Sequence, residues 1–366
     1  MLDRRLYNHI DWALLAAVLA ITAMGVVMIY AATGGASTAA NRQLVMTQLY
    51  AVALGLIAIL IVLFIDYQTL ADVSHVIYFV TAAALLFVLL FGTVRGGARR
   101  WIALPYFNLQ PSEFAKLALA LVLAKYFAGL QRTRPDGKDL LIAGAFTVGL
   151  IVLIALEPDL GTAVTLVAIF MALAFVSGMR LRVVAVILAI AVVTTPIAWR
   201  FALKDYQKAR ISTFLNPERD PRGAGYQQIQ ARITVGSGGV WGKGFMKGTQ
   251  GQLRFLPEAH NDFMFSVLAE EQGLMGVLVA LGLYLAVMLR SISAARLAKD
   301  RLGAYLVVGI LAGFGFQVFY NITMSAGLAP VKGLTLPLMS YGGSAMIATL
   351  AGFGLILNVR MRRFTN

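Results

Sequence analysis

Seven of the carboxylates within or beside the apolar parts of this chain are worth weighing as side chains that could do chemistry. An ionised carboxylate among apolar residues is costly, so each one either pairs with a base or marks a functional site. These acids are Glu113, Glu157, Asp159, Glu258, Asp262, Glu270 and Glu271.

Asp262 differs from the other acids because it lies where a polar stretch meets a long apolar run that begins at Phe263. Apolar surroundings raise the pKa of a carboxylate, and a base in such a position can take a proton from a sugar hydroxyl. An aspartate that caps the following helix would occupy the same position. The residues alone leave both roles open for Asp262.

Glu113 follows Pro111 at the start of another apolar run, and Lys116 comes three residues after it. Proline favours the first turn of a helix, and residues three apart share a helix face, so the pattern predicts an ion pair between Glu113 and Lys116.

The remaining acids fall in two places. Glu157 and Asp159 lie in a short turn, where Asp159 either caps the next helix or contacts a substrate. Glu270 and Glu271 lie in the run after Asp262, roughly 12 Å inside its outer end at the rise of an α-helix. We expect these two to pair with a buried base or a serine rather than to do chemistry.

The elements that position these acids are membrane helices. Of 366 residues, 59% are hydrophobic and 13% are charged, with a mean hydropathy of +0.78. A soluble domain averages about 25% charged residues, which excludes a soluble enzyme with a single anchor, and the lack of alternation excludes a β-barrel. A helix needs about 20 apolar residues to cross a bilayer. The predicted spans are Trp12–Thr33, Leu49–Ile65, Val76–Phe91, Pro111–Ala128, Leu140–Leu156, Thr162–Gly178, Leu181–Trp199, Phe263–Leu289, Ala304–Met324 and Pro337–Leu357.

The sequence thus predicts an all-α polytopic membrane protein with ten transmembrane helices, forming a single domain over residues 1–366. Cysteine is absent, which excludes disulfides, thiolate nucleophiles and thiolate-bound metals. The three histidines are too scattered for a multi-histidine metal site.

Lysine and arginine in short loops are retained on the cytoplasmic side of a membrane. They concentrate in both tails and in the even-numbered connections, so both termini are predicted to be cytoplasmic. The opposite face is also basic, through Arg95, Arg99, Arg100 and the connection between the seventh and eighth spans. Topology does not require these charges, and they suit anionic lipid headgroups or an anionic substrate.

That connection, residues 200–261, is predicted to be a large extracytoplasmic loop. Loops of this length are usually functional or disordered, and its aromatic content argues against disorder. Tyr226, Ile229 and Ile233 recur at helical spacing, so Tyr226–Val235 is expected to form an interfacial amphipathic helix. A solvated basic loop is the alternative. The glycine-rich segment Gly236–Gly248 lacks the spacing of a P-loop, and either allows close backbone approach or is simply flexible.

Five motifs occur in order along the chain. They are Arg99–Ile102, Gln110–Lys116, Glu157–Ala163, Leu256–Phe263 and Ser340–Ser344. Together they resemble the SEDS family (shape, elongation, division and sporulation), whose members are ten-helix bacterial peptidoglycan polymerases. Lys247–Gln250 and Ala269–Glu271 resemble the elongation (RodA) branch, whereas Pro330–Pro337 is closer to the division (FtsW) branch.

The resemblance implies glycosyl transfer at the outer leaflet, which joins lipid II units into glycan strands during cell elongation and cell-shape maintenance. Asp262 would be the general base that deprotonates the 4-hydroxyl of the acceptor, and undecaprenyl pyrophosphate would leave. An α-linked donor and a β-linked product imply one inverting displacement. A neutralised pyrophosphate leaves readily, so a dedicated general acid is not needed.

The resemblance also implies site residues. The substrate-binding candidates are Arg99, Arg100, Trp101, Lys116, Arg210, Glu258, His260 and Ser340, with Glu113 and Asp159 in support. Arg99, Arg100, Lys116 and Arg210 are the candidates for the pyrophosphate. Magnesium or manganese would suit an oxygen-only site, with Glu113, Asp159 and Asp262 as the candidate ligands. No organic cofactor is expected.

The expected partners are lipid II, a class B penicillin-binding protein for cross-linking, other membrane proteins of the elongation complex, and membrane lipids, with no role for nucleic acid. The expected location is the bacterial inner membrane, with the active site on its extracytoplasmic face. A lipid II flippase is the alternative from another class, and a structural scaffold is a third. Transporters commonly show repeated halves with helices broken at the midplane. No such repeat is visible, and the ionisable residues gather near one face, which favours the polymerase.

Overall fold

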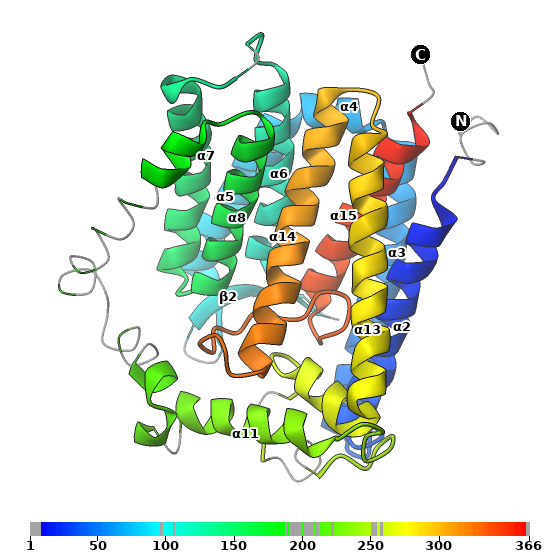
Figure 1. Ribbon diagram of the computed structural model, residues 1–366. Helices are drawn as coiled ribbons and strands as arrows, with labels where there is room; N and C mark the ends of the chain where they lie inside the picture. The colour runs from blue at the N-terminus through cyan, green and yellow to red at the C-terminus, as the bar shows by residue number, and fades with distance from the viewer. Residues whose placement is uncertain are drawn as a thin grey trace.

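The computed structural model describes most of the chain as a bundle of helices (Figure 1). About half of the predicted seventh span, Leu181–Trp199, lies outside the described residues, and Arg210 and Glu258 lie outside them too. The described residues are 9–95, 98–104, 107–132, 134–186, 189, 193, 196, 200, 208, 212–220, 223–249, 255–256 and 259–363.

Helices occur at the other nine predicted spans, within the part of the chain described. The α-helices are α2 (Trp12–Ala32), α3 (Ala39–Phe64), α4 (Tyr67–Asp72), α5 (Ser74–Phe91), α6 (Pro111–Ala128), α7 (Gly137–Leu156), α8 (Leu160–Val176), α11 (Ala224–Ser237), α13 (Met264–Arg296), α14 (Arg301–Ser325) and α15 (Gly343–Met361). A 3-10 helix, η1 (Pro217–Arg219), precedes α11. Seven of these helices are long and apolar enough to cross a membrane, namely α2, α3, α5, α7, α13, α14 and α15. The total of ten spans stays a prediction.

Short polar side chains fix where several helices begin. Asp11 accepts a hydrogen bond from Leu14 N at the start of α2, and Thr38 accepts one from Asn41 N at the start of α3. Asp136 forms a capping box with Asp139 at the start of α7. Such caps satisfy backbone N–H groups that have no partner within the helix, so the apolar runs start at defined residues.

Helix α6 lies inside the bundle and carries charged residues at membrane depth. It packs against α5, α7, α8, α14 and α15, and most of its side chains are buried. Glu113 and Lys116 on this helix therefore face protein and not lipid, which makes their charges tolerable. The predicted bounds of this span match the helix residue for residue.

One local feature departs from the predicted all-α fold. The segment between α5 and α6 forms a small antiparallel sheet of β1 (Thr93–Arg95), β2 (Ala98–Ala103) and β3 (Asn108–Leu109), in the order β1-β2-β3. The all-α prediction was wrong here because the chain between α5 and α6 pairs its backbone in short antiparallel strands, and such short strands leave little pattern in the sequence. The sheet places Arg99, Arg100 and Trp101 near the N-terminal end of α6.

The predicted start of the last span, at Pro337, was also wrong. Helix α15 begins at Gly343, and Pro337–Gly342 belongs to the connection after α14. Leu338 in this connection has a left-handed φ of 67°. The segment is apolar because it is buried inside the bundle, so its composition resembled that of a helix. We refer to residues 326–342 as the α14–α15 loop.

Helix α13 contains a break that the sequence did not reveal. Gly273 has φ 64° and ψ −163°, which separates Met264–Gln272 from the long helix that follows. Gly239 and Val240 accept hydrogen bonds through their carbonyl oxygens from Leu274 N and Met275 N just after the break. The prediction of one continuous span through Glu270 and Glu271 was therefore wrong, because both acids precede the break and contact the glycine-rich segment.

The two ends of the bundle differ. The start of α2, the end of α15 and α4 lie at one end, and α11 lies at the other (Figure 1). Helix α11 covers the predicted helix Tyr226–Val235. Its buried face consists of small and polar residues such as Gln228 and Ala231, while Ile233 is exposed. We refer to the two ends as the α4 end and the α11 end.

Candidate active site

Asp262 lies in a turn, His260–Asp262, just before α13. The three side chains of this turn are half-buried, whereas Phe263 is fully buried. Two hydrogen bonds from other elements hold the backbone: Tyr341 N donates to His260 O at 2.9 Å, and Asn321 Nδ2 on α14 donates to Asp262 O at 2.8 Å. The half-buried carboxylate is thus carried on a turn whose backbone is held by two other elements.

The α14–α15 loop forms one wall of this turn. A Cβ placed on Gly333 would lie 3.6 Å from Asp262 Oδ2, so the backbone of the loop passes beside the carboxylate. On the other side of the loop, a Cβ on Gly161 would lie 2.8 Å from Leu334 Cγ. The loop therefore lies between the Asp262 turn and the start of α8.

Side chains from several helices hold this irregular loop in place. Tyr284 Oη donates to Pro337 O at 2.7 Å, and Tyr320 Oη donates to Pro330 O at 2.8 Å. Gln48 on α3 accepts a hydrogen bond from Gly342 N at 3.1 Å. Ser340 Oγ accepts one from Leu336 N at 2.9 Å. Non-helical backbone inside a membrane protein needs such partners.

Asp159 caps α8 and gathers a set of polar residues around it. Its carboxylate accepts hydrogen bonds from Thr162 N at 3.3 Å and from Thr162 Oγ1 at 2.9 Å. Gln110 Nε2 and Ser112 Oγ each donate to Asp159 Oδ2 at 3.2 Å. The structure thus shows the capping role, and the substrate contact stays a prediction.

Arg100 is bound to the same turn. Its guanidinium donates from Nε to Glu157 O at 2.8 Å and from Nη2 to Pro158 O, and Nη1 lies 4.0 Å from Asp159 Oδ1. Arg100 therefore links β2 to the α7–α8 turn. Arg99 is exposed and donates to Leu90 O at 2.9 Å.

Glu157 is buried at the centre of this turn, with 1% of its surface exposed. Both carboxylate oxygens lack a hydrogen-bond partner among the described residues. Burial raises the pKa of Glu157 to about 8, the Asp159 charge adds to the rise, and the Arg100 charge opposes it. Glu157 therefore holds a proton at neutral pH.

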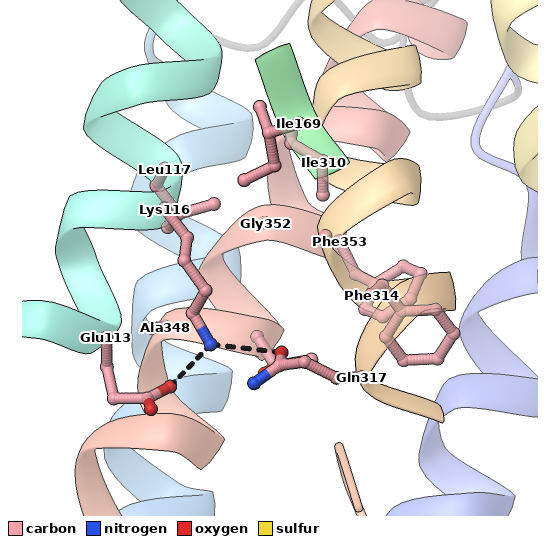
Figure 2. Close-up of a pocket in the computed structure, with 12 residues that line it drawn as sticks. Glu113, Lys116, Leu117, Ile169, Ile310, Phe314, Gln317, Ala348, Gly352 and Phe353 are labelled. Carbon is pink, nitrogen blue, oxygen red and sulfur yellow. Dashed lines mark hydrogen bonds and ion pairs between the residues drawn. The ribbon is translucent and has the colours of Figure 1, made fainter. Parts of the chain in front are cut away.

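The predicted ion pair on α6 is present. Lys116 Nζ lies 2.7 Å from Glu113 Oε2 and donates to Gln317 Oε1 on α14 at 3.0 Å (Figure 2). All three side chains are buried. They line a cavity of about 30 Å³ between α6, α8, α14 and α15, enough for about two water molecules.

Glu270 pairs with a base as expected, whereas Glu271 accepts a hydrogen bond from a backbone N–H group. Lys243 Nζ lies 2.6 Å from Glu270 Oε1, and Thr249 N donates to the same oxygen at 3.0 Å. Glu271 Oε2 accepts a hydrogen bond from Met246 N at 3.1 Å. These contacts join the glycine-rich segment to the first part of α13.

The site residues predicted from the sequence thus fall into separate groups. His260 and Asp262 share one turn, Arg100 and Asp159 share another, and Glu113 and Lys116 form the buried pair. Trp101 is half-buried in β2, where its carbonyl oxygen accepts a hydrogen bond from Thr93. Ser340 Oγ accepts a hydrogen bond within the α14–α15 loop. Arg210 and Glu258 lie outside the described residues.

The proposed metal ligands Glu113, Asp159 and Asp262 do not fit one cation. Among the described residues no group of three acidic or histidine side chains could hold a metal ion. Glu113 is neutralised by Lys116, and Asp159 is saturated by hydrogen bonds. Glu113, Asp159 and Asp262 therefore do not form one metal site.

The sequence reasoning missed the uncharged polar residues inside the spans. Gln48, Tyr284, Gln317 and Asn321 are buried and hydrogen-bond to the site or to its supporting loop. Amides and hydroxyls inside apolar runs were the signal that could have found them, because a polar group at membrane depth must have a partner.

Comparison with known proteins identifies the class. A family model described as cell cycle protein, covering FtsW, RodA and SpoVE, matches residues 11–364. The chain therefore belongs to the FtsW, RodA and SpoVE family, which its motifs resembled.

Two relatives illustrate the breadth of the match. Peptidoglycan glycosyltransferase MrdB of Escherichia coli strain K12 is 37% identical over 355 residues, which are 97% of this chain and 94% of that protein. Probable peptidoglycan glycosyltransferase FtsW of Trichlorobacter lovleyi is 38% identical over 361 residues, with 95% and 92% covered.

Solved structures share the fold. A chain from work described as structural coordination of polymerization and crosslinking by a peptidoglycan synthase complex matches with a TM-score of 0.85 at 34% identity, covering 98% of this chain and 99% of that one. Rod shape determining protein RodA of Thermus thermophilus matches with a TM-score of 0.72 at 31% identity, covering 98% of each chain.

Proposed function

We propose that this chain is a peptidoglycan glycosyltransferase that polymerises lipid II into glycan strands during cell elongation. The match to named peptidoglycan glycosyltransferases over nearly the whole chain carries this proposal. The half-buried carboxylate of Asp262, on a turn held by α14 and the α14–α15 loop, supports it as the position of the base.

In the proposed reaction Asp262 takes the proton of the acceptor 4-hydroxyl as that oxygen forms a bond to C1 of the donor sugar. The bond between C1 and the pyrophosphate oxygen breaks, and undecaprenyl pyrophosphate leaves with the bonding electron pair. The configuration at C1 inverts in this single displacement. Exposed Arg99 and the basic residues of the outer loop offset the charge that develops on the leaving group.

A lipid-linked donor also needs a place for its chain. An apolar cavity of about 510 Å³ lies between α3, α5, α6 and α15. Pro111 and Phe114 at the start of α6 line it, close in sequence to Gln110 and Ser112 of the Asp159 group. Its size and apolar lining suit part of a polyprenyl chain.

The proposed location is the inner membrane, with the α4 end cytoplasmic and the α11 end extracytoplasmic. The basic residues of the α4 end support this orientation. A class B penicillin-binding protein is the proposed partner for cross-linking, and a solved structure similar to this chain is described as part of a synthase complex that coordinates polymerization and crosslinking. Other membrane proteins of the elongation complex and membrane lipids complete the proposed partners.

The test is polymerisation of purified lipid II by the solubilised protein together with its penicillin-binding partner. We expect glycan strands from the wild type and none from Asp262→Asn. Asp220→Asn, an aspartate in the large loop after η1, is the matched control and should retain activity.

Strands from Asp262→Asn at the wild-type rate would remove Asp262 from the chemistry. If neither protein makes strands and lipid II instead crosses reconstituted vesicles, the flippase alternative replaces the polymerase. Magnesium or manganese remains a proposal from the family resemblance, and chelation followed by return of each ion tests it in the same assay.

A further inference from the structure

We propose that Asn321 is a positioning residue for the reaction, because it fixes the Asp262 turn against the α14–α15 loop. This inference rests on the proposed function, in which Asp262 is the base. It assigns a positioning role to a buried, uncharged amide on α14.

Asn321 joins two segments that are distant in the sequence. Its Nδ2 donates to Asp262 O at 2.8 Å and to Leu334 O at 2.7 Å. The side chain is fully buried, with 0% of its surface exposed. Both N–H groups of the amide are therefore used, and the two carbonyl oxygens fix its orientation.

Only a side chain with two donors on one nitrogen can make this bridge at this length. A carboxylate of the same shape accepts hydrogen bonds but donates none when ionised. Alanine would leave the carbonyl oxygens of Asp262 and Leu334 without this partner. The amide of Asn321 thus acts as a donor to two backbone carbonyl groups. If the residue only filled space, an apolar side chain could take its place.

The oxygen atom of the same amide, Oδ1, is evidence against a purely stabilising role for Asn321. Asn321 Oδ1 is buried and has no hydrogen-bond partner among the described residues. A buried acceptor without a partner costs free energy, so its presence needs a reason other than stability. Holding a reacting carboxylate in place is such a reason.

The neighbouring contacts show what the bridge positions. Tyr341 N holds His260 O at the other end of the same turn, and Gly333 lies beside Asp262 Oδ2. The α14–α15 loop therefore meets the turn directly at Tyr341 and Gly333. Asn321 on α14 adds a third link, which joins the backbone carbonyl of Asp262 to that of Leu334 in the loop. Loss of the hydrogen bond from Asn321 would let the Asp262 backbone shift while the fold of the helices stays intact.

Asn358 on α15 offers a matched control. It is also 0% exposed, and its Nδ2 also donates to backbone carbonyl oxygens, those of Val62 at 2.7 Å and Ile65 at 2.6 Å. These contacts join α15 to the end of α3, at the α4 end of the bundle. Asn358 therefore tests the general cost of losing a buried amide far from Asp262.

The experiment compares lipid II polymerisation by Asn321→Ala and Asn358→Ala, each at matched folded fraction. We expect Asn321→Ala to lower kcat about 100-fold with KM changed less than about threefold, because a small misplacement of a catalytic group has an effect of this size. Asn358→Ala should lower the Tm and leave kcat unchanged. Asn321→Ser keeps one donor and should give an intermediate kcat. If Asn321→Ala fails to fold, Asn321→Ser tests the proposal in its place.

Two results would overturn the proposal: wild-type kcat in Asn321→Ala or Asn321→Ser, or an equal loss of kcat in Asn358→Ala. Because groups that act as a unit are non-additive, Asn321→Ala should have no further effect on any residual rate of Asp262→Asn. Wild-type activity of Asp262→Asn would refute the assignment of the base, whereas inactive Asp262→Asn with a fully active Asn321→Ala would refute the positioning role alone.

Discussion

At the residue scale, the charged side chains near the site mostly bind other protein groups. Arg100 and Asp159 secure the α7–α8 turn, and Lys116 is neutralised by Glu113. Asp262 is distinguished by a turn whose backbone is held while its side chain is half-buried. The amide of Asn321 and the hydroxyl of Tyr284 contribute to the site through backbone contacts.

Glu157 gives a prediction about pH. Its pKa rises from an ordinary value of 4.5 to about 8 in the folded chain because of burial. Between these values the folded state holds one more proton than the unfolded state, so the free energy of unfolding falls as pH rises. This stabilisation is complete below pH 4.5 and is lost as pH rises through about 8.

We therefore expect the Tm of the wild type to fall more steeply between about pH 5 and pH 8 than the Tm of Glu157→Gln. Thermal unfolding in detergent over this pH range measures both curves. Glu218→Gln, at an exposed glutamate in η1, should behave as the wild type. Parallel curves for the wild type and Glu157→Gln would contradict the burial of a protonated acid.

The pair of Glu113 and Lys116 gives a second prediction. Removing one member leaves a buried charge, so Lys116→Met should lower the free energy of unfolding by about 3–5 kcal/mol. The double variant Glu113→Gln with Lys116→Met should recover most of that loss. The exposed pair of Lys125 and Asp72, which involves the same helix, is the control: Lys125→Met should cost less than about 1 kcal/mol. Equal losses at Lys116 and Lys125, measured by thermal unfolding, would argue against the buried pair.

At the element scale, apolar runs of about 20 residues located the helices, and Asp159 caps α8 as one of its two predicted roles. The predictions failed where backbone leaves the helical conformation inside the bundle, at Gly273 and in Pro337–Gly342. Pro337–Gly342 is apolar because protein surrounds most of it. The break at Gly273 had no distinct signal, because a single glycine is tolerated within a helix. A high content of apolar residues indicates that a segment is buried, but it does not distinguish a buried helix from a buried loop.

Glycine contacts between elements give a third prediction. A Cβ on Gly238 would lie 1.9 Å from the carbonyl oxygen of Ala269. This oxygen belongs to the backbone of α13, so it cannot move aside as the end of a flexible side chain could. Gly238→Ala should therefore lower the free energy of unfolding by about 1–3 kcal/mol, as overpacking does. Gly236→Ala, two residues away in α11 with nothing within 4 Å, should be neutral or stabilising by up to about 1 kcal/mol.

Thermal unfolding of the two glycine variants in parallel measures this difference. The same Tm for Gly238→Ala and Gly236→Ala would mean that α11 does not pack closely on α13 in solution.

At the scale of the whole molecule, the ends of the bundle should face opposite sides of the membrane. The chain contains no cysteine, so single cysteines report on each end without background. Trp241, which is 78% exposed, lies beside the break in α13, and Lys299 is exposed before α14. In right-side-out vesicles an impermeant thiol reagent should label Trp241→Cys, and should label Lys299→Cys only after the membrane is opened. The reverse pattern would invert the proposed orientation.

The sequence by itself determined the membrane class, the helix at nine of the ten predicted spans within the described residues, the bounds of α6, the ion pair of Glu113 with Lys116 and the motifs of the family. These features are local, because the thickness of the bilayer and the period of the helix apply to any apolar run. Only the tertiary structure decided which partners complete the irregular backbone. Asn321 reaches Asp262 across 59 residues of sequence, and Gln48 reaches Gly342 across 294. Such contacts satisfy buried carbonyl and N–H groups through whichever helix passes nearby, and that proximity is set by the packing of the bundle as a whole.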